Sequence, residues 1–364
     1  MLNVIVRVDA STVIGSGHLM RCLTLAKRLR MMGHSVTFVM RAHQGSMQTV
    51  VEQQDFSYRM LARPSSYHGK EYESWLGVSQ KEDAVDTIAV MGKQVNLLIV
   101  DHYALDHEWE ELLRPHVNSI LVIDDLANRS HLCDFLLDVN LDAEKGNKYA
   151  SLVPRSCHTF LGINYLLLRQ EFYDATLGQR HDTGTEHDCM RVFVCFGGSD
   201  PTNETMRTIR ALSRYRKSKL DVYVVIGASN LHRRELEDFC RPLHWHVYCQ
   251  IDYVALLMAK SDCAIGAGGT MTWERCFVGL PSLVVAVAEN QREDAVLHDH
   301  RGIISYAGFW RDLNDKTLNE KIRSFLDDKE RQARIRENGR AIFTETHTEE
   351  MLEEVTMRAA AWKI

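Results

Sequence analysis

Short apolar runs alternate with helical patterns along most of this chain. In the first half, buried strands are predicted at Val4–Val8, Ser35–Met40, Asn96–Val100, Ser119–Ile123 and Phe135–Val139. After the first strand, apolar residues recur at helical spacing from Leu19 to Leu29, and Gly33 lies just past the last of them, as expected for a helix end. Strands joined by helices predict right-handed crossovers and a parallel sheet.

The second half repeats this alternation. Its strands are predicted at Arg191–Phe196, Leu220–Ile226, His246–Cys249, Cys263–Ile265 and Ser282–Val287. Helical patterns cover Leu231–Cys240 and Tyr253–Lys260, and from Asp315 the chain is helical and charged, with a last helix that ends near Trp362. The stretch from Gly178 to Asp188 is polar and without periodicity, which is typical of a linker.

These patterns predict an α/β protein with two doubly wound parallel-sheet domains. We place them at residues 1–177 and 191–364, joined by a linker at 178–190 and separated by a crevice. The last helix can stay with the second domain or pack back on the first. Ligands of such sheets bind at the carboxyl ends of the strands, so we expect the functional residues in the loops that follow them.

The composition is that of an ordinary globular protein, and it excludes several partner classes. Of the 364 residues, 45% are hydrophobic and 25% are charged, and the formal charge of −6 offers no basic field for nucleic acid or an anionic membrane. The nine cysteines lack a CxxC pair, which favours a reducing compartment, and Arg7 comes too early for a signal peptide. The longest apolar run, Leu283–Ala288, is too short to span a bilayer. We expect a cytoplasmic monomer.

The 17 histidines are dispersed along the chain. Two pairs are close in sequence, His244 with His246 and His298 with His300, but neither pair has a third ligand nearby. We therefore predict no metal site and no cofactor.

The strongest chemical signal is the loop after the first strand. Gly15 and Gly17 lead into the first turn of a predicted helix, where His18 stands, and Asp9 begins the loop. A glycine loop and a helix start form an anion site, because the first helical amides have no intrahelical partner. A titratable imidazole there favours proton chemistry beside a bound anion. The alternative is that His18 is an ordinary residue at a helix start.

Two further glycine loops follow strands of the second half. Gly197 and Gly198, followed by Ser199, lie before a helix that Asp200 or Thr202 can cap. The alternative is that this pair of glycines forms only a tight turn. The segment Gly266–Glu274 has three glycines in four positions at its start, a cost in backbone entropy that a diphosphate site at a helix start would explain.

In that segment, Gly268, Gly269 and Thr270 precede the helix, and Glu274 lies one turn further on. The carboxylate of Glu274 can accept hydrogen bonds from two sugar hydroxyls. The alternative is that it merely stabilises the start of the helix through the macrodipole.

Several other charged residues are candidates for a functional role. Arg21 lies one turn after His18 and can meet a phosphate or simply solvate the helix. Arg169 follows a triple-leucine run near the domain junction, a place that favours a functional role. Asp124 and Asp125 end a strand, where they can orient a base or cap the next turn.

Taken together, the motifs resemble those of the UDP-sugar hydrolases of the pseudaminic acid pathway. The motifs are RVDAS…IGSGHLMRCL from Arg7, LLLRQEF from Leu166, FGGSDP from Phe196, GAGGTMTWE from Gly266 and AENQ from Ala288. The resemblance covers nearly the whole chain. Where this chain has Thr270, the family motif has serine as often, which keeps the hydroxyl. The fold that it implies is GT-B, shared with the glycosyltransferase that adds N-acetylglucosamine to the lipid-linked peptidoglycan precursor.

That family releases UDP from UDP-2,4-diacetamido-2,4,6-trideoxy-β-L-altropyranose. The resemblance implies that His18 is the catalytic base, with Tyr103 and Asn290 completing the catalytic group. The predicted substrate-binding residues are Asp9, Gly15, Gly17, Arg21, Arg169, Gly198, Ser199, Gly268, Gly269, Thr270, Glu274 and Gln291.

The residues support hydrolysis of a nucleotide sugar by a single displacement. UDP is a good leaving group, so the reaction needs its charge stabilised by loop amides and a water activated by His18. One base opposite one leaving group predicts inversion at the anomeric carbon, without a metal. Two alternatives stay open: a GT-B glycosyltransferase with a UDP-sugar donor, and a non-catalytic UDP-sugar binding protein, which would have no use for His18.

Overall fold

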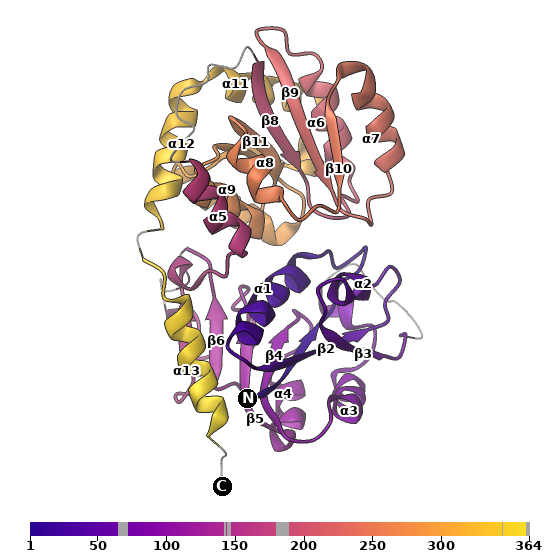
Figure 1. Ribbon diagram of the computed structural model, residues 1–364, viewed down its shortest axis with the longest axis vertical. Helices are drawn as coiled ribbons and strands as arrows, with labels where there is room; N and C mark the ends of the chain where they lie inside the picture. The colour runs from indigo at the N-terminus through magenta and orange to yellow at the C-terminus, as the bar shows by residue number, and fades with distance from the viewer. Residues whose placement is uncertain (65–71, 142, 144–146, 180–188, 344, 362–364) are drawn as a thin grey trace. The chain divides into compact units, whose positions relative to one another are not determined.

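The computed structural model describes residues 1–64, 72–141, 143, 147–179, 189–343 and 345–361 (Figure 1). The chain divides into two compact units, Met1–Leu167 with Thr344–Ile364 and Leu168–Phe343. The first unit ends before the boundary expected at residue 177, so the helix α5 (Gln170–Gln179) belongs to the second unit. Most of the expected linker, residues 180–188, lies outside the described residues, as does Trp362.

The first unit is built on a seven-stranded parallel sheet of order β3-β2-β1-β4-β5-β6-β7. Its strands are β1 (Asn3–Val8), β2 (Ser35–Arg41), β3 (Ser57–Leu61), β4 (Val95–Asp101), β5 (Val117–Ile123), β6 (Phe135–Asp138) and β7 (His158–Leu161). Its helices are α1 (Gly17–Met31), α2 (Gln48–Glu52), α3 (Gln80–Met91), α4 (His107–Leu113) and α13 (Thr348–Ala360), with 3₁₀ turns at Tyr72–Leu76, Arg114–His116 and Ile163–Tyr165.

Successive side chains of a strand point to opposite faces of the sheet, and each face of this sheet carries a hydrophobic core. In β1, Val4, Val6 and Val8 pack with apolar residues of α1, α2 and α13, whereas Ile5 packs with those of α3 and α4. The last helix, α13, lies against β4 and β5 and so returns to the first unit (Figure 1).

The second unit is a six-stranded parallel sheet of order β10-β9-β8-β11-β12-β13. The strands are β8 (Cys189–Cys195), β9 (Lys219–Ile226), β10 (His246–Cys249), β11 (Cys263–Ala267), β12 (Ser282–Ala286) and β13 (Ser305–Phe309). Besides α5, the helices are α6 (Glu204–Leu212), α7 (Arg233–Cys240), α8 (Val254–Ala259), α9 (Thr270–Val278), α10 (Arg292–His300), α11 (Asp315–Asp327) and α12 (Lys329–Ala341), with 3₁₀ turns at Arg241–Leu243, Glu289–Gln291 and Trp310–Asp312.

Every predicted strand is present, and the described residues contain three further strands that the prediction missed. The missed strands, β3, β7 and β13, are all edge strands of their sheets. Such strands bury less of their length, so their sequences lack the continuous apolar run on which the prediction depends. Among the described residues, no helix is both long and apolar enough to cross a membrane.

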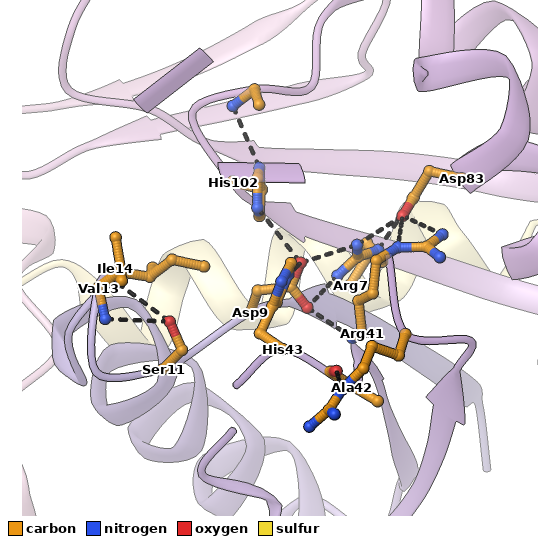
Figure 2. Close-up of polar contacts among 12 residues, drawn as sticks. Arg7, Asp9, Ser11, Val13, Ile14, Arg41, Ala42, His43, Asp83 and His102 are labelled. Carbon is orange, nitrogen blue, oxygen red and sulfur yellow. Dashed lines mark hydrogen bonds and ion pairs between the residues drawn. The ribbon is translucent and has the colours of Figure 1, made fainter. Parts of the chain in front are cut away.

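A buried polar network ties together the carboxyl ends of β1 and β2 and the helix α3 (Figure 2). Arg7 lies two residues after Ile5 in β1, so its side chain is on the same face of the sheet and points toward α3. There it donates to both oxygens of Asp83, at 3.0 and 2.7 Å. Arg41, at the end of β2, donates to the same carboxylate at 2.8 Å, and Trp109 Nε1 donates at 3.0 Å. Asp9 completes the network by accepting two hydrogen bonds from Arg7, at 2.7 and 2.9 Å.

Replacing Asp83 by Asn should destabilise the first unit strongly. The amide would leave two buried guanidinium groups without their shared counter-charge, which costs about 3–5 kcal/mol in the free energy of unfolding. The control is Asp86→Asn, since Asp86 pairs with the same Arg41 from a half-buried position and should cost about 0–1 kcal/mol. The measurement is the denaturant midpoint of each variant, and equal losses in the two variants would contradict the assignment.

Candidate active site

The first cluster of candidate residues lies where the winding of the first sheet reverses. Strands β1 and β4 are neighbours, with Val8 opposite Asp101, and their loops leave in opposite directions along the sheet. Ser11 holds the loop after β1, accepting from the Val13 and Ile14 amides at 3.2 Å (Figure 2). The chain then enters α1 without a side-chain cap, so the first amides of the helix stay available to an anion.

His18, in the first turn of α1, is held by Asp101 at the end of β4. The distance from His18 Nδ1 to Asp101 Oδ1 is 2.6 Å, and both side chains are buried. Burial by itself would raise the pKa of Asp101, but the charges of Arg21 and His18 hold it well below its usual range. Arg21 Nη2, which can only donate, also lies 3.1 Å from Nδ1, but the contact with Asp101 is shorter by 0.5 Å. Because an ionised carboxylate has no proton to donate, this shorter contact assigns the hydrogen to Nδ1. The lone pair of a neutral His18 is then on Nε2.

Arg21 connects this pair to a second carboxylate. It donates to both oxygens of Asp101, at 2.6 and 2.7 Å, and to Asp125 Oδ2 at 2.9 Å. Burial would raise the pKa of Asp125, but Arg21 and then the Tyr103 hydroxyl keep it low. The sequence left Arg21 two roles, phosphate binding or solvation of the helix. The structure shows a third, in which its guanidinium holds the carboxylates of Asp101 and Asp125 next to His18.

Tyr103 completes the cluster, as a residue of the predicted catalytic group. Its hydroxyl donates to Asp125 Oδ1 at 2.6 Å, and its ring lies edge-on to His18 with 4.5 Å between ring centroids. Burial and the charge of Asp125 raise the pKa of Tyr103 well above its usual value, so the phenol stays protonated. Trp75 stacks on Tyr103 at 5.8 Å, which adds an aromatic wall beside the imidazole.

Two acidic residues lie in structural roles instead. Asp9 is 1% exposed and is surrounded by Arg7, the Arg41 amide, His43 and His102 (Figure 2). Asp124 accepts from the Ala127 amide at 2.9 Å and from the Tyr149 hydroxyl at 3.1 Å, which closes the turn after β5. Of Asp124 and Asp125, only Asp125 therefore contacts residues next to His18, namely Arg21 and Tyr103.

The second cluster lies at the carboxyl ends of β8, β11 and β12 in the second unit. Here too the winding reverses, between the neighbouring strands β8 and β11. Gly269, at φ +86°, precedes α9, and that helix begins at Thr270 without a side-chain cap. Gln291 lies against Gly268 and accepts from the Val287 amide at 3.0 Å, while Asn290 is exposed in the 3₁₀ turn before α10.

The loop after β8 contributes Gly198 and Ser199, both half-buried. Gly198 is packed so closely on Gly227 that a Cβ at residue 227 would lie 2.6 Å from the Gly198 carbonyl oxygen. Beyond this loop, Asp200 accepts from the amides of Glu204 and Thr205 at 3.0 and 2.9 Å. The N-cap residue of α6 is Asn203, without a side-chain cap hydrogen bond, so Asp200 satisfies the first two helical amides from outside the cap position.

Arg169 and Glu274, predicted as ligand residues, bind each other within the second unit. Arg169 donates to Glu274 Oε1 at 3.2 and 3.0 Å and also pairs with Glu171. Burial would lower the pKa of Arg169, but Glu274 and Glu171 raise it. Glu274 is 7% exposed, and Arg169 occupies only Oε1, so the second carboxylate oxygen is not used by that ion pair.

Asp101 is the main residue that the sequence reading missed. It follows the predicted strand Asn96–Val100 directly, the same signal that singled out Asp124 and Asp125. Within the described ranges, no three histidine, cysteine, aspartate or glutamate side chains are grouped so as to hold a metal ion.

Comparison of the sequence with known proteins finds two similarities. Residues 191–350 match the glycosyltransferase family 28 C-terminal domain. The chain is 27% identical, over 296 residues, to the UDP-2,4-diacetamido-2,4,6-trideoxy-beta-L-altropyranose hydrolase of Campylobacter jejuni, covering 81% of this chain and 95% of that one. The predicted resemblance is confirmed.

Solved structures support the fold. MurG of Acinetobacter baumannii has a TM-score of 0.63 at 12% identity, covering 98% of this chain and all of that one. The spinosyn rhamnosyltransferase SpnG, complexed with thymidine diphosphate, has a TM-score of 0.69 at 14% identity with the same coverage. At this identity the likeness concerns the fold alone, and the predicted GT-B class of two parallel-sheet domains is confirmed.

The geometry predicts an uncommon tautomer for His18. In the neutral ring, the hydrogen should be on Nδ1, where it is donated to Asp101, and Nε2 should be unprotonated. Nitrogen-15 NMR of histidine-labelled protein at alkaline pH measures this directly. Asp101→Asn should shift the population toward the Nε2–H form, because the amide can donate to Nδ1. Tyr103→Phe, which leaves Asp101 in place, should not; an Nε2–H ring in the unchanged protein would contradict the assignment.

Proposed function

We propose that this protein hydrolyses a UDP-sugar at the anomeric C–O bond, with inversion, releasing UDP and the free sugar. The observation that carries the proposal is the 2.6 Å hydrogen bond between His18 Nδ1 and Asp101, which leaves Nε2 as a base at the start of an uncapped helix. The similarity to the Campylobacter hydrolase supports this reaction class and suggests the substrate, UDP-2,4-diacetamido-2,4,6-trideoxy-β-L-altropyranose.

In the proposed reaction, His18 Nε2 takes a proton from water as its oxygen attacks the anomeric carbon. The bond from that carbon to the UDP oxygen breaks, and UDP leaves with the electron pair. Asp101 stabilises the imidazolium that forms, because its carboxylate already accepts the Nδ1 hydrogen. Arg21 and Asp125 keep that carboxylate in place, and the Tyr103 ring limits rotation of the imidazole.

In the second unit we propose a site for the nucleotide. The amides at the start of α9, after Gly268 and Gly269, would bind the diphosphate and stabilise its charge as it leaves. Glu274 would accept from the ribose hydroxyls through the oxygen that Arg169 does not use. Gly198, Ser199, Thr270, Asn290 and Gln291 lie in the loops around these strand ends and would contact the rest of the ligand.

Replacing His18 by Ala should reduce turnover by about a hundred- to ten-thousand-fold, the contribution of a positioned general base. Affinity for UDP should stay nearly unchanged, because His18 acts on water. The matched control is His116→Ala, which removes an exposed histidine of the same unit. The measurement is UDP release from the UDP-sugar together with calorimetry of UDP binding. Full activity of the His18 variant would remove the base assignment, and lost UDP binding would make His18 a binding residue.

The bond that breaks can be identified with oxygen-18 water. Attack at the anomeric carbon should put the label in the sugar and none in UDP, as measured by mass spectrometry of both products. Because amides are proposed to stabilise the leaving diphosphate, activity should survive EDTA. Label in a nucleotide product, or magnesium-dependent activity, would contradict the mechanism. UDP release only in the presence of an added hydroxyl acceptor would favour a glycosyltransferase.

A further inference from the structure

Arg275, in the helix α9, is a buried cation that forms no ion pair with any described residue. Its side chain is fully buried, and Nη2 donates to the Ala267 carbonyl at 2.8 Å and to Thr272 Oγ1 at 3.1 Å. Its Nε and Nη1 atoms have no hydrogen-bond partner among the described residues. Glu274, the adjacent carboxylate in sequence, pairs with Arg169 instead. A buried guanidinium of this kind is destabilising unless another negative charge compensates it.

The guanidinium lies against Gly266 near the end of β11, next to the glycine loop that follows this strand. A Cβ added to Gly266 would lie 2.9 Å from Arg275 Nη1 and 2.2 Å from the Cys195 carbonyl oxygen, so only glycine leaves room for this approach. The group is therefore located where the ends of β8 and β11 meet, at the start of the helix that carries it.

The hydrogen bond to Ala267 links the cation to the loop amides. Every described peptide bond is trans, so the Ala267 carbonyl and the Gly268 N–H point in opposite directions from one peptide unit. A cation that binds the carbonyl polarises that unit and makes the N–H a stronger donor on the other side. Burial lowers the pKa of Arg275, but a guanidinium remains protonated in a protein interior.

We propose that Arg275 is a positioning residue for anion binding: a fixed positive charge, behind the segment Gly266–Gly269, that raises the affinity of this segment for the diphosphate of a nucleotide. It does not touch the ligand. It acts through the Ala267–Gly268 peptide and through its charge, which is weakly screened in a buried setting. This inference rests on the nucleotide site of the proposed function and not on the hydrolytic step.

The proposal predicts an effect that grows with the number of phosphates. Arg275→Met keeps an unbranched apolar stem, shorter than that of arginine, and removes the charge, so UDP should bind about tenfold or more weakly, UMP less so, and uridine within about twofold. Arg275→Lys keeps the charge and should retain most of the UDP affinity. The control is Arg336→Met, which removes an exposed arginine that donates to the Gly279 and Asp262 carbonyls, at the opposite ends of the strands.

Dissociation constants from calorimetry and the melting temperature of each ligand-free variant are the two readouts. The apolar variant should melt no lower than the unchanged chain, because replacing an uncompensated buried charge by an apolar group is often neutral or stabilising. A lower melting temperature with equal losses for UDP and uridine would assign Arg275 a structural role and overturn the proposal. Unchanged UDP affinity in both Arg275→Met and Arg275→Gln would also overturn it.

If Arg275→Met does not fold, the Arg275→Gln variant is compared in the same way, and failure of both to fold would overturn the proposal in favour of a structural role. Failure of the unchanged chain to bind UDP is a separate result. It would overturn the proposed nucleotide site itself, and with it this inference.

Discussion

The reversal of winding direction within each sheet is the constraint on which both candidate sites depend. In the first sheet β1 and β4 lie side by side, and in the second β8 and β11 do, with connections that leave in opposite directions. Loops that diverge from two neighbouring strands leave the strand ends between them accessible. This places His18, which follows β1, against Asp101, which ends β4. It also places the glycine loops after β8 and β11 at one edge of the second sheet.

The first unit separates two groups of charges that are close in sequence. Asp9 and Asp83 neutralise Arg7 and Arg41 beneath the surface, in a network with the character of a structural core. Asp101 and Asp125 instead surround a histidine and an arginine at the loop edge. Side chains alternate between the two faces of a strand, and this explains part of the separation between the two groups of charges. Arg7, like Ile5, is on the face that α3 covers.

Much of the fold could be predicted, because central strands of a parallel sheet are buried on both faces and therefore appear as continuous apolar runs. The edge strands β3, β7 and β13 could not, because segments such as Ser57–Leu61 mix polar and apolar residues. His18 could be singled out because glycines and a helix start are local signals. Its partner could not, because Asp101 lies 83 residues away and only the pairing of β1 with β4 brings it near. The burial of Asp9 could not be predicted either, since it depends on His43 and His102, which follow β2 and β4.

At the carboxyl edge of the second sheet, main-chain atoms are the packing surface. Gly227 rests on Gly198, and Gly266 rests on the Cys195 carbonyl, with distances that no side chain could occupy. The spacing of the loops there is consequently fixed by the hard-core radii of the backbone itself. Side-chain cores tolerate exchange of one apolar residue for another, because neighbouring rotamers can adjust. A backbone contact has no such freedom, so this edge should keep its shape while the hydrophobic residues beneath it diverge.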